Sequence, residues 1–251
     1  MRMIILCVDG IDPDLVQEYG WDKVFKHNYS LKIPQECYVP DKELGSTPHT
    51  TRVWPTIFSG QIIDYGLTRR MGTRKKIHDL LVRLGITWKR GKPKFKVAPV
   101  NQDLNTLFDD FRSFTWNLPT MDPEWIATFP SYDSFVEHCK RELWMFMLMT
   151  QGAVYSVFPV NAFYVRFVDF IGHNEPEKLR GAYDNIFLHA SELKKKDEVI
   201  LLSDHGCING LHTERAYFGS DYPLLAESVH ELRHEFERIF IELGIDYRED
   251  E

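Results

Sequence analysis

The segment MIILCVDG, residues 3–10, contains the pattern that decides the fold. Its six apolar residues, Met3 to Val8, run without interruption, which is typical of a strand that is buried on both faces of a sheet. Asp9 and Gly10 follow directly, so the strand is expected to deliver a carboxylate at its C-terminal end. A parallel α/β sheet is the architecture that covers both faces of such a strand.

Further strand-like segments alternate with helical patterns along the rest of the chain. Strands are expected at Phe95 to Val100, Ala162 to Val168 and Val199 to Leu202. Capping residues and apolar residues at helical spacing predict helices that begin near Asp12 and cover residues 51–59, 77–84, 179–193 and 225–243. This alternation predicts a doubly wound α/β fold, with a mostly parallel central sheet and helices on both faces.

The length of 251 residues fits one domain, residues 1–251, rather than several. Within it, residues 68–133 are expected to form a small inserted cap. Residues 101–133 have the least regular pattern, with three prolines and several aromatic residues, so loops are expected there. These loops would form either a wall over a substrate or an aromatic satellite of the core.

The stretch from Leu143 to Val165 carries no formal charge over 23 residues, which is long enough to cross a bilayer. Gln151, Gly152 and Pro159 interrupt it, and its second half has the pattern of a strand. We therefore expect a buried helix followed by a strand, and no membrane segment.

The spacing of the cysteines indicates in which cellular compartment the protein is expected. The four of them lie far apart and form no CxxC pair: Cys7, Cys37, Cys139 and Cys207. The N-terminus lacks the long apolar run and the cleavage site of a signal peptide. A cytoplasmic protein with reduced thiols is therefore expected.

Charge is unevenly distributed along the chain. The formal net charge of −7 does not favour a dedicated nucleic-acid-binding protein. The segment from Arg69 to Lys96, called the basic strip below, nevertheless has eleven Lys or Arg residues and one acid. A solvated surface explains such a strip, because lysine and arginine are normally exposed. The functional alternative is that the strip guides a phosphate-rich substrate or a nucleic-acid strand, with Trp88 and Phe95 available for stacking on bases.

Aspartate and histidine residues cluster where the predicted strands end. Six potential metal ligands lie at or shortly after these ends: Asp9, Asp169, His173, Asp204, His205 and His212. Taken singly, each has an ordinary explanation as a helix cap or a hydrogen-bonded histidine. Because the carboxyl ends of parallel strands meet at one edge of a sheet, we expect the six side chains to be neighbours.

The chemistry of this ligand set is specific. Carboxylate oxygens and neutral imidazole nitrogens suit Zn²⁺ or Mn²⁺, and three of each can complete two sites. Two such ions about 4 Å apart can clamp the attacking and leaving oxygens of a phosphoryl displacement. Without metal, the three aspartates would repel one another strongly.

Four segments, in this order, carry a resemblance to a known family. They are VDGIDPDLV at 8–16, HTTRVWPTIFSG at 49–60, FVDFIGH at 167–173 and VILLSDHGCINGLHTERAYFG at 199–219. Together they resemble the motifs of the alkaline phosphatase superfamily, in particular its phosphodiesterase and nucleotide pyrophosphatase branch. The resemblance implies one metal ion held by Asp9, Asp204 and His205, and a second held by Asp169, His173 and His212.

The same resemblance aligns Thr50 with the nucleophile, and Thr51 is the competing candidate if the register shifts by one. A threonine hydroxyl is a weak nucleophile, so it needs a metal ion and a helix N-terminus beside it. Candidate substrate-binding groups are Arg112, Trp54 and the basic strip.

The activity that the resemblance implies is that of a two-metal-dependent phosphodiesterase or nucleotide pyrophosphatase. It would act on a phosphate ester or nucleotide through a phosphothreonine or nucleotidyl-threonine intermediate. A phosphomonoesterase or phosphomutase of the same superfamily is one alternative, because Val53 stands where the pyrophosphatase branch usually has asparagine. An alternative of another class is a nucleotide- or nucleic-acid-binding module with weak or no catalysis.

Overall fold

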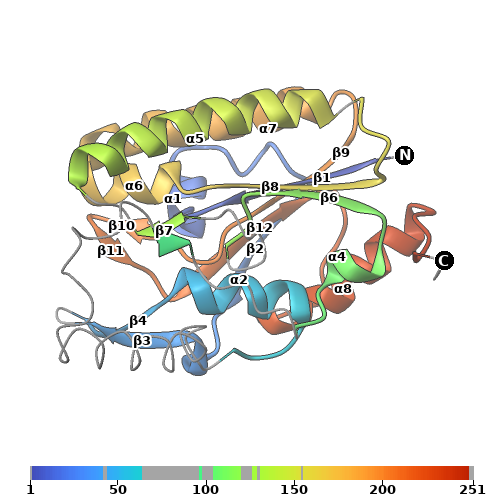
Figure 1. Ribbon diagram of the computed structural model, residues 1–251, viewed down its shortest axis with the longest axis horizontal. Coiled ribbons are helices and arrows are strands. Elements are labelled where there is room, and N and C mark those ends of the chain that lie inside the picture. The colour runs from blue at the N-terminus through green and yellow to red at the C-terminus, as the bar shows by residue number, and fades with distance from the viewer. Residues whose placement is uncertain are drawn as a thin grey trace, which may run out of the picture.

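A computed structural model describes residues 2–41, 44–63, 96–97, 104–119, 126–128, 131–153 and 155–248. A six-stranded sheet lies at its centre, and helices cover both faces (Figure 1). In spatial order the strands are β2 (His27–Lys32), β12 (Arg215–Ser220), β9 (Glu198–Leu202), β1 (Met3–Val8), β8 (Val160–Val165) and β6 (Ser113–Trp116). Strands β9, β1, β8 and β6 are parallel, whereas β12 is antiparallel to both β9 and β2. The predicted doubly wound, mostly parallel α/β fold is confirmed.

The helices form one layer on each side of this sheet. On one face lie α5 (Tyr132–Ala153), α6 (Phe167–Asn174) and α7 (Leu179–Leu193), and on the other lie α2 (Thr50–Ser59), α4 (Leu107–Asp110) and α8 (Leu232–Glu242) (Figure 1). The short helix α1 (Pro13–Glu18) follows β1, and short 3₁₀ turns occupy Gln35–Cys37, Pro176–Lys178 and Val229–Glu231. Three two-stranded sheets complete the described part: β3 (Tyr38–Asp41) with β4 (Gly45–Pro48), β5 (Lys96–Val97) with β7 (Ile126–Thr128), and β10 (Cys207–Ile208) with β11 (Leu211–His212).

Strand β1 divides the core into two halves. All six of its residues are fully buried, as the uninterrupted apolar run predicted. Because side chains alternate across a strand, Ile4, Leu6 and Val8 pack with α5, α6 and α7, while the odd-numbered residues pack with α2, α4 and α8. Burying each large apolar side chain contributes about 1.5–3 kcal/mol, so β1 anchors both helix layers.

Several helix signals act as expected. The Asp12 carboxylate accepts hydrogen bonds from the Asp14 and Leu15 amides at the start of α1, and α7 covers the predicted residues 179–193. The uncharged stretch 143–165 forms the second half of α5 and then β8, so the prediction of a helix and a strand is confirmed. No helix in the described ranges is long and apolar enough to cross a membrane.

Three expectations about element boundaries were wrong. Strand β8 ends at Val165 and α6 begins at Phe167, so Asp169 and His173 lie on a helix rather than at the end of a strand. The C-terminal helix begins at Leu232 instead of 225, because Ser228 caps a 3₁₀ turn that comes first.

The third difference concerns residues 101–133, where loops were expected. Their described part contains α4 and β6, and β6 extends the central sheet by pairing with β8. The expected strand at 95–100 is described only at β5, which pairs with β7 outside the central sheet. The helix predicted at 77–84, nearly all of the basic strip and most of the expected cap at 68–133 lie outside the described residues.

A buried ion pair joins α5 to the end of β8. The Glu142 carboxylate accepts hydrogen bonds from the Arg166 amide at 3.0 Å and from Arg166 Nε at 3.2 Å. Asn117 Nδ2 donates to the same carboxylate at 2.7 Å. Burial raises the pKa of Glu142, but Arg166 and the hydrogen bonds outweigh burial and lower this pKa below its ordinary value.

We expect Glu142→Gln to lower the free energy of unfolding by about 3–5 kcal/mol, because Arg166 would keep a buried charge without its partner. Urea denaturation at pH 7 measures this. The contribution is complete above the ordinary pKa of 4.5 and is lost as the pH falls through the lower folded-state pKa, so acid should narrow the difference between wild type and variant. Glu137→Gln, at an exposed position of the same helix, is the control and should change stability by at most about 0.5 kcal/mol. Equal losses of stability in Glu142→Gln and Glu137→Gln would contradict a stabilising role of the ion pair between Glu142 and Arg166.

Candidate metal centre

The first group of candidate ligands lies where β1 and β9 end side by side. Asp9 follows β1, and Asp204 and His205 follow β9. The His205 Nε2 atom lies 3.2 Å from Asp9 Oδ1 and 3.5 Å from Asp204 Oδ2, and all three side chains are buried. The parallel pairing of β1 with β9 therefore brings together residues that are some 200 positions apart in the sequence.

The second group comes from α6 and from the hairpin β10–β11. Asp169 and His173 are one turn apart on α6, so they share a face of that helix. Asp169 Oδ1 lies 3.3 Å from His173 Nε2 and 3.3 Å from His212 Nε2, and the two Nε2 atoms are 2.8 Å apart. Three potential ligand atoms thus converge on one point.

The two groups are in direct contact. The imidazole rings of His205 and His212 stack with their centroids 4.0 Å apart, and Asp169 can share a metal with both of them. The backbone supports this contact, since the Asp169 amide donates to the Asp9 carbonyl at 2.9 Å. The structure therefore brings all six predicted ligands into one continuous cluster.

Burial and close contact shift the pKa values of the cluster's side chains. Burial, together with the nearby carboxylates of Asp9 and Asp169, raises the pKa of Asp204 well above its ordinary value. Burial also raises the pKa of Asp169, but the imidazoles of His173 and His212 outweigh it and lower this pKa. Burial lowers the pKa of His205 to about 4, which leaves a neutral imidazole at pH 7. Asp169 raises the pKa of His173 and, against the effect of burial, that of His212. Carboxylate oxygens and imidazole nitrogens together are donors that suit divalent cations.

Orphaned oxygen atoms give an independent indication that divalent ions fit here. Within the described residues, Asp9 Oδ1, Asp169 Oδ1 and both carboxylate oxygens of Asp204 are buried and have no hydrogen-bond partner. Leaving a buried carboxylate oxygen without a hydrogen bond is costly, whereas a bound cation would satisfy it. The donor set fits two divalent metal ions, one at Asp9, Asp204 and His205, and one at Asp169 with its neighbouring histidines.

Thr50 begins α2 next to the first group. Its Oγ1 atom lies 3.4 Å from Asp9 Oδ2 and 3.3 Å from His205 Nε2. The alternative candidate, Thr51, is engaged elsewhere, because its Oγ1 lies 2.7 Å from Nδ1 of the helix-capping His49. The Thr50 amide has no acceptor in the described residues, so it is free to donate at the helix N-terminus. The geometry therefore brings the hydroxyl of Thr50, and not that of Thr51, to the first group of candidate ligands.

Two candidate substrate-binding residues are not at this cluster. Trp54 is fully buried in the core, where its ring packs against Phe58 and Tyr164, so it cannot contact a substrate. Arg112 is exposed but precedes β6, at the amino ends of the parallel strands and hence at the edge opposite Asp9. The structure thus brings neither residue to the cluster, because helical spacing and charge reveal neither burial nor strand direction.

Two neighbours of the cluster were missed by the sequence analysis. Tyr164, on β8, donates from its hydroxyl to Asp9 Oδ2 at 2.7 Å, and both side chains are buried. Cys207, on β10, has its Sγ atom within 4.8 Å of ligand atoms of Asp169 and His173. The alternation of side chains along the strand could have placed Tyr164 on the face that α2 covers. No sequence pattern could have placed Cys207, because its position near Asp169 and His173 is a tertiary contact.

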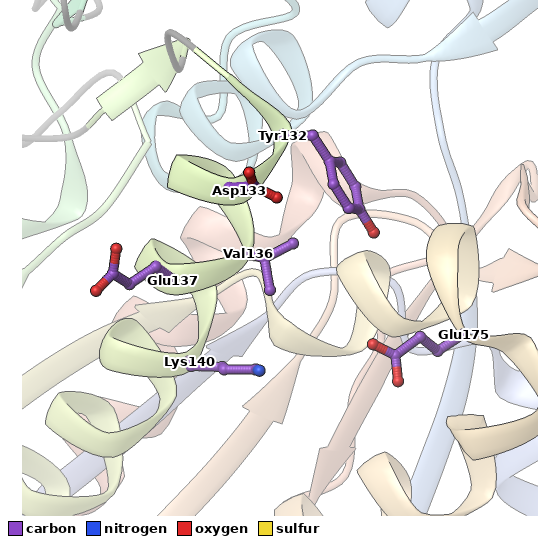
Figure 2. Close-up of a pocket in the computed structure, with 6 residues that line it drawn as sticks. All are labelled: Tyr132, Asp133, Val136, Glu137, Lys140 and Glu175. Carbon is purple, nitrogen blue, oxygen red and sulfur yellow. The ribbon is translucent and has the colours of Figure 1, made fainter.

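A pocket of about 390 Å³ lies elsewhere, between the start of α5 and the end of α6 (Figure 2). Its lining consists of Tyr132, Asp133, Val136, Glu137, Lys140 and Glu175. In Figure 2 the Lys140 side chain points toward Glu175, whereas Glu137 points away from the gap. None of the six metal-ligand candidates contributes to it, so the metal cluster remains the candidate site.

Comparison with known proteins identifies the fold. The sequence matches no protein-family model and no curated protein. The alkaline phosphatase of the Antarctic bacterium TAB5 is similar, with a TM-score of 0.52 and 10% identity over 95% of this chain and 97% of that one. Weaker structural matches are a variant of that enzyme with Mg bound in its M3 site (TM-score 0.47, 10% identity, 95% and 97%) and the PH0037 protein of Pyrococcus horikoshii (0.44, 9%, 100% and 98%). The chain therefore has an alkaline phosphatase-like fold.

Metal binding should stabilise the folded protein. We expect Zn²⁺ at a hundred times its Kd to raise the free energy of unfolding by about 2.7 kcal/mol per site, because the unfolded chain does not hold the ligands together. Asp204→Asn should remove most of the gain from the site at Asp9, Asp204 and His205, about 2.7 kcal/mol, while the exposed Asp246→Asn should retain the full gain. Calorimetric melting with Zn²⁺ and with EDTA measures both. An unchanged gain in Asp204→Asn would exclude Asp204 as a ligand.

Tyr164 should raise the metal affinity of the site at Asp9, Asp204 and His205, because its hydroxyl holds the Asp9 carboxylate. Tyr164→Phe removes the hydroxyl that orients the Asp9 carboxylate, so we expect metal affinity to fall about 10–100-fold, as for other groups that hydrogen-bond to metal ligands. Competition with a chromophoric chelator measures the affinity. Tyr217→Phe is the matched control, since that buried hydroxyl donates to Asn28 instead. Equal affinities of the two variants would show that Tyr164 has no such role.

Proposed function

We propose that this protein is a two-metal-dependent phosphohydrolase that acts through Thr50, and that its substrates are phosphodiesters or nucleotide pyrophosphates. The observation that carries the proposal is the position of the Thr50 hydroxyl, within 3.4 Å of Asp9 and 3.3 Å of His205 at the start of α2. The alkaline phosphatase-like fold supports a phosphate ester as substrate. The four motif segments that resemble the phosphodiesterase and pyrophosphatase branch support a diester.

In the first half-reaction, Thr50 Oγ1 attacks phosphorus, a new oxygen–phosphorus bond forms, and the bond to the leaving alcohol breaks. The proton of the threonine hydroxyl passes to water, and the leaving oxygen gains one. Divalent ions, when bound, would lower the pKa of the hydroxyl and stabilise negative charge on the phosphate and leaving group. The free Thr50 amide and the positive end of the α2 dipole would hold a phosphate oxygen.

In the second half-reaction, water attacks the phosphothreonine and releases the threonine hydroxyl and a phosphate monoester. Asp169, His173 and His212 lie beside the first ligand group, so the two groups can serve the attacking and leaving oxygens in turn. Tyr164 and the buried backbone contacts hold Asp9 in place throughout. The same residues can therefore serve both steps.

The nucleophile is tested with Thr50→Ala and Thr51→Ala. We expect Thr50→Ala to lower kcat for bis(p-nitrophenyl) phosphate by about 10³-fold or more, the scale of losing a catalytic nucleophile, while metal content stays near that of the wild type. Thr51→Ala should retain most activity, because its hydroxyl is engaged by His49. Full activity of Thr50→Ala, or loss of activity in Thr51→Ala alone, would overturn the assignment.

Substrate class is tested by comparing bis(p-nitrophenyl) phosphate with p-nitrophenyl phosphate, which share a leaving group. A higher kcat/KM for the diester supports the proposal, and a preference for the monoester indicates a phosphomonoesterase instead. Chelation should abolish turnover of either substrate. A salt-dependent gel shift with nucleic acid and no chelator-sensitive hydrolysis would instead identify a binding module.

A further inference from the structure

The hairpin β10–β11 carries a cysteine next to one of the proposed metal ligands. Asn209 and Gly210 form its two-residue turn with φ angles of 51° and 78°, as a type I′ turn requires. This turn pairs Cys207 with His212 across the two strands. Directly opposed residues of antiparallel strands point to the same side. The thiol therefore lies on the face of the hairpin that presents His212.

Helix α6 packs closely on the thiol. Gly172 lies on this helix between Asp169 and His173, and a Cβ atom built at Gly172 would come within 2.6 Å of Cys207 Sγ. Glycine at this position therefore allows helix and hairpin to approach. Ligand atoms of Asp169, His173 and Cys207 all lie within 4.8 Å of one another.

The surroundings of the thiol indicate a cation. Cys207 is fully buried, and its Sγ atom lies within 4.8 Å of a carboxylate oxygen of Asp169. The Oδ1 atom of Asp169 is itself buried and has no hydrogen-bond partner in the described residues. Two imidazole nitrogens lie 3.3 Å from that same oxygen. A carboxylate oxygen of Asp169, an imidazole nitrogen of His173 and the sulfur of Cys207, all within 4.8 Å of one another, are a ligand set for a thiophilic divalent ion.

We propose that Cys207 supplies a thiolate ligand to the ion that Asp169 and His173 would hold, which leaves a coordination position open. The inference rests on the two-metal centre of the proposed function. It gives the two metal sites different ligand atoms and therefore different metal preferences. As the bond between sulfur and metal forms, the thiol proton is released to solvent. Thiolate is a soft ligand, so this position selects Zn²⁺, Cd²⁺ or Co²⁺ over Mn²⁺ and Mg²⁺, whereas Asp9, Asp204 and His205 offer only oxygen and nitrogen.

X-ray absorption at the zinc edge tests the proposal on the wild-type protein. With two Zn²⁺ bound, we expect a sulfur scatterer at about 2.3 Å besides nitrogen and oxygen at about 2.0–2.1 Å, and with Co²⁺ a thiolate charge-transfer band in the near ultraviolet. Cys207→Ser should lose the sulfur signal and the band. Cys37→Ser, at a buried cysteine whose thiol contacts Thr56 instead, should keep both.

The outcomes separate this inference from the proposed function. Two bound Zn²⁺ ions without a sulfur scatterer would overturn the role of Cys207 and leave the two-metal phosphohydrolase standing. A wild-type protein that binds no metal would overturn both. Should Cys207→Ser fail to fold, the wild-type spectrum still shows whether sulfur is bound, and a signal that disappears in Cys37→Ser would contradict the assignment.

Discussion

The crowding of three carboxylates at the edge of one sheet is the constraint on which this structure depends. Asp9 and Asp204 are buried and Asp169 is partly buried beside them, and several of their oxygens lack hydrogen-bond partners in the described residues. Such an arrangement costs folding free energy in the metal-free chain. A pair of divalent ions, as proposed, would offset this cost at the same atoms that would carry the chemistry.

The backbone around β1 explains how this crowding is held in place. Gly10 adopts a φ of 89°, and a Cβ atom there would lie 2.6 Å from the backbone of Asp169. Only glycine allows α6 to come this close to the end of β1. The carbonyls of Asp9 and Gly10 then accept hydrogen bonds from the amides of Asp169 and Cys207. One turn therefore ties both ligand groups together through main-chain atoms.

Local patterns predicted the parts of the fold that depend on short-range physics. The run from Met3 to Val8 indicated a strand covered on both faces, and α7 was predicted over its full length because its apolar stripe is regular. Strand β6 and the start of α6 were not predicted, since β6 is short and half-buried, and Arg166 marks no clear break before the helix. In both cases pairing or packing with distant segments decides the structure, and local propensity is too weak to reveal it.

For the candidate site, the sequence by itself determined which residue types are available and that three of them follow buried strands. The sequence pattern does not reveal the order and direction of the strands in space. Their order sets Asp9 beside His205, and the direction of β6 leaves Arg112 at the opposite edge. Only the tertiary structure shows that the Thr50 hydroxyl, and not that of Thr51, lies beside Asp9, and that Tyr164 and Cys207 approach the candidate metal ligands. The physical reason is that hydrogen bonds and metal coordination act over a few ångströms, and only the packed chain brings residues that are far apart in sequence within that range.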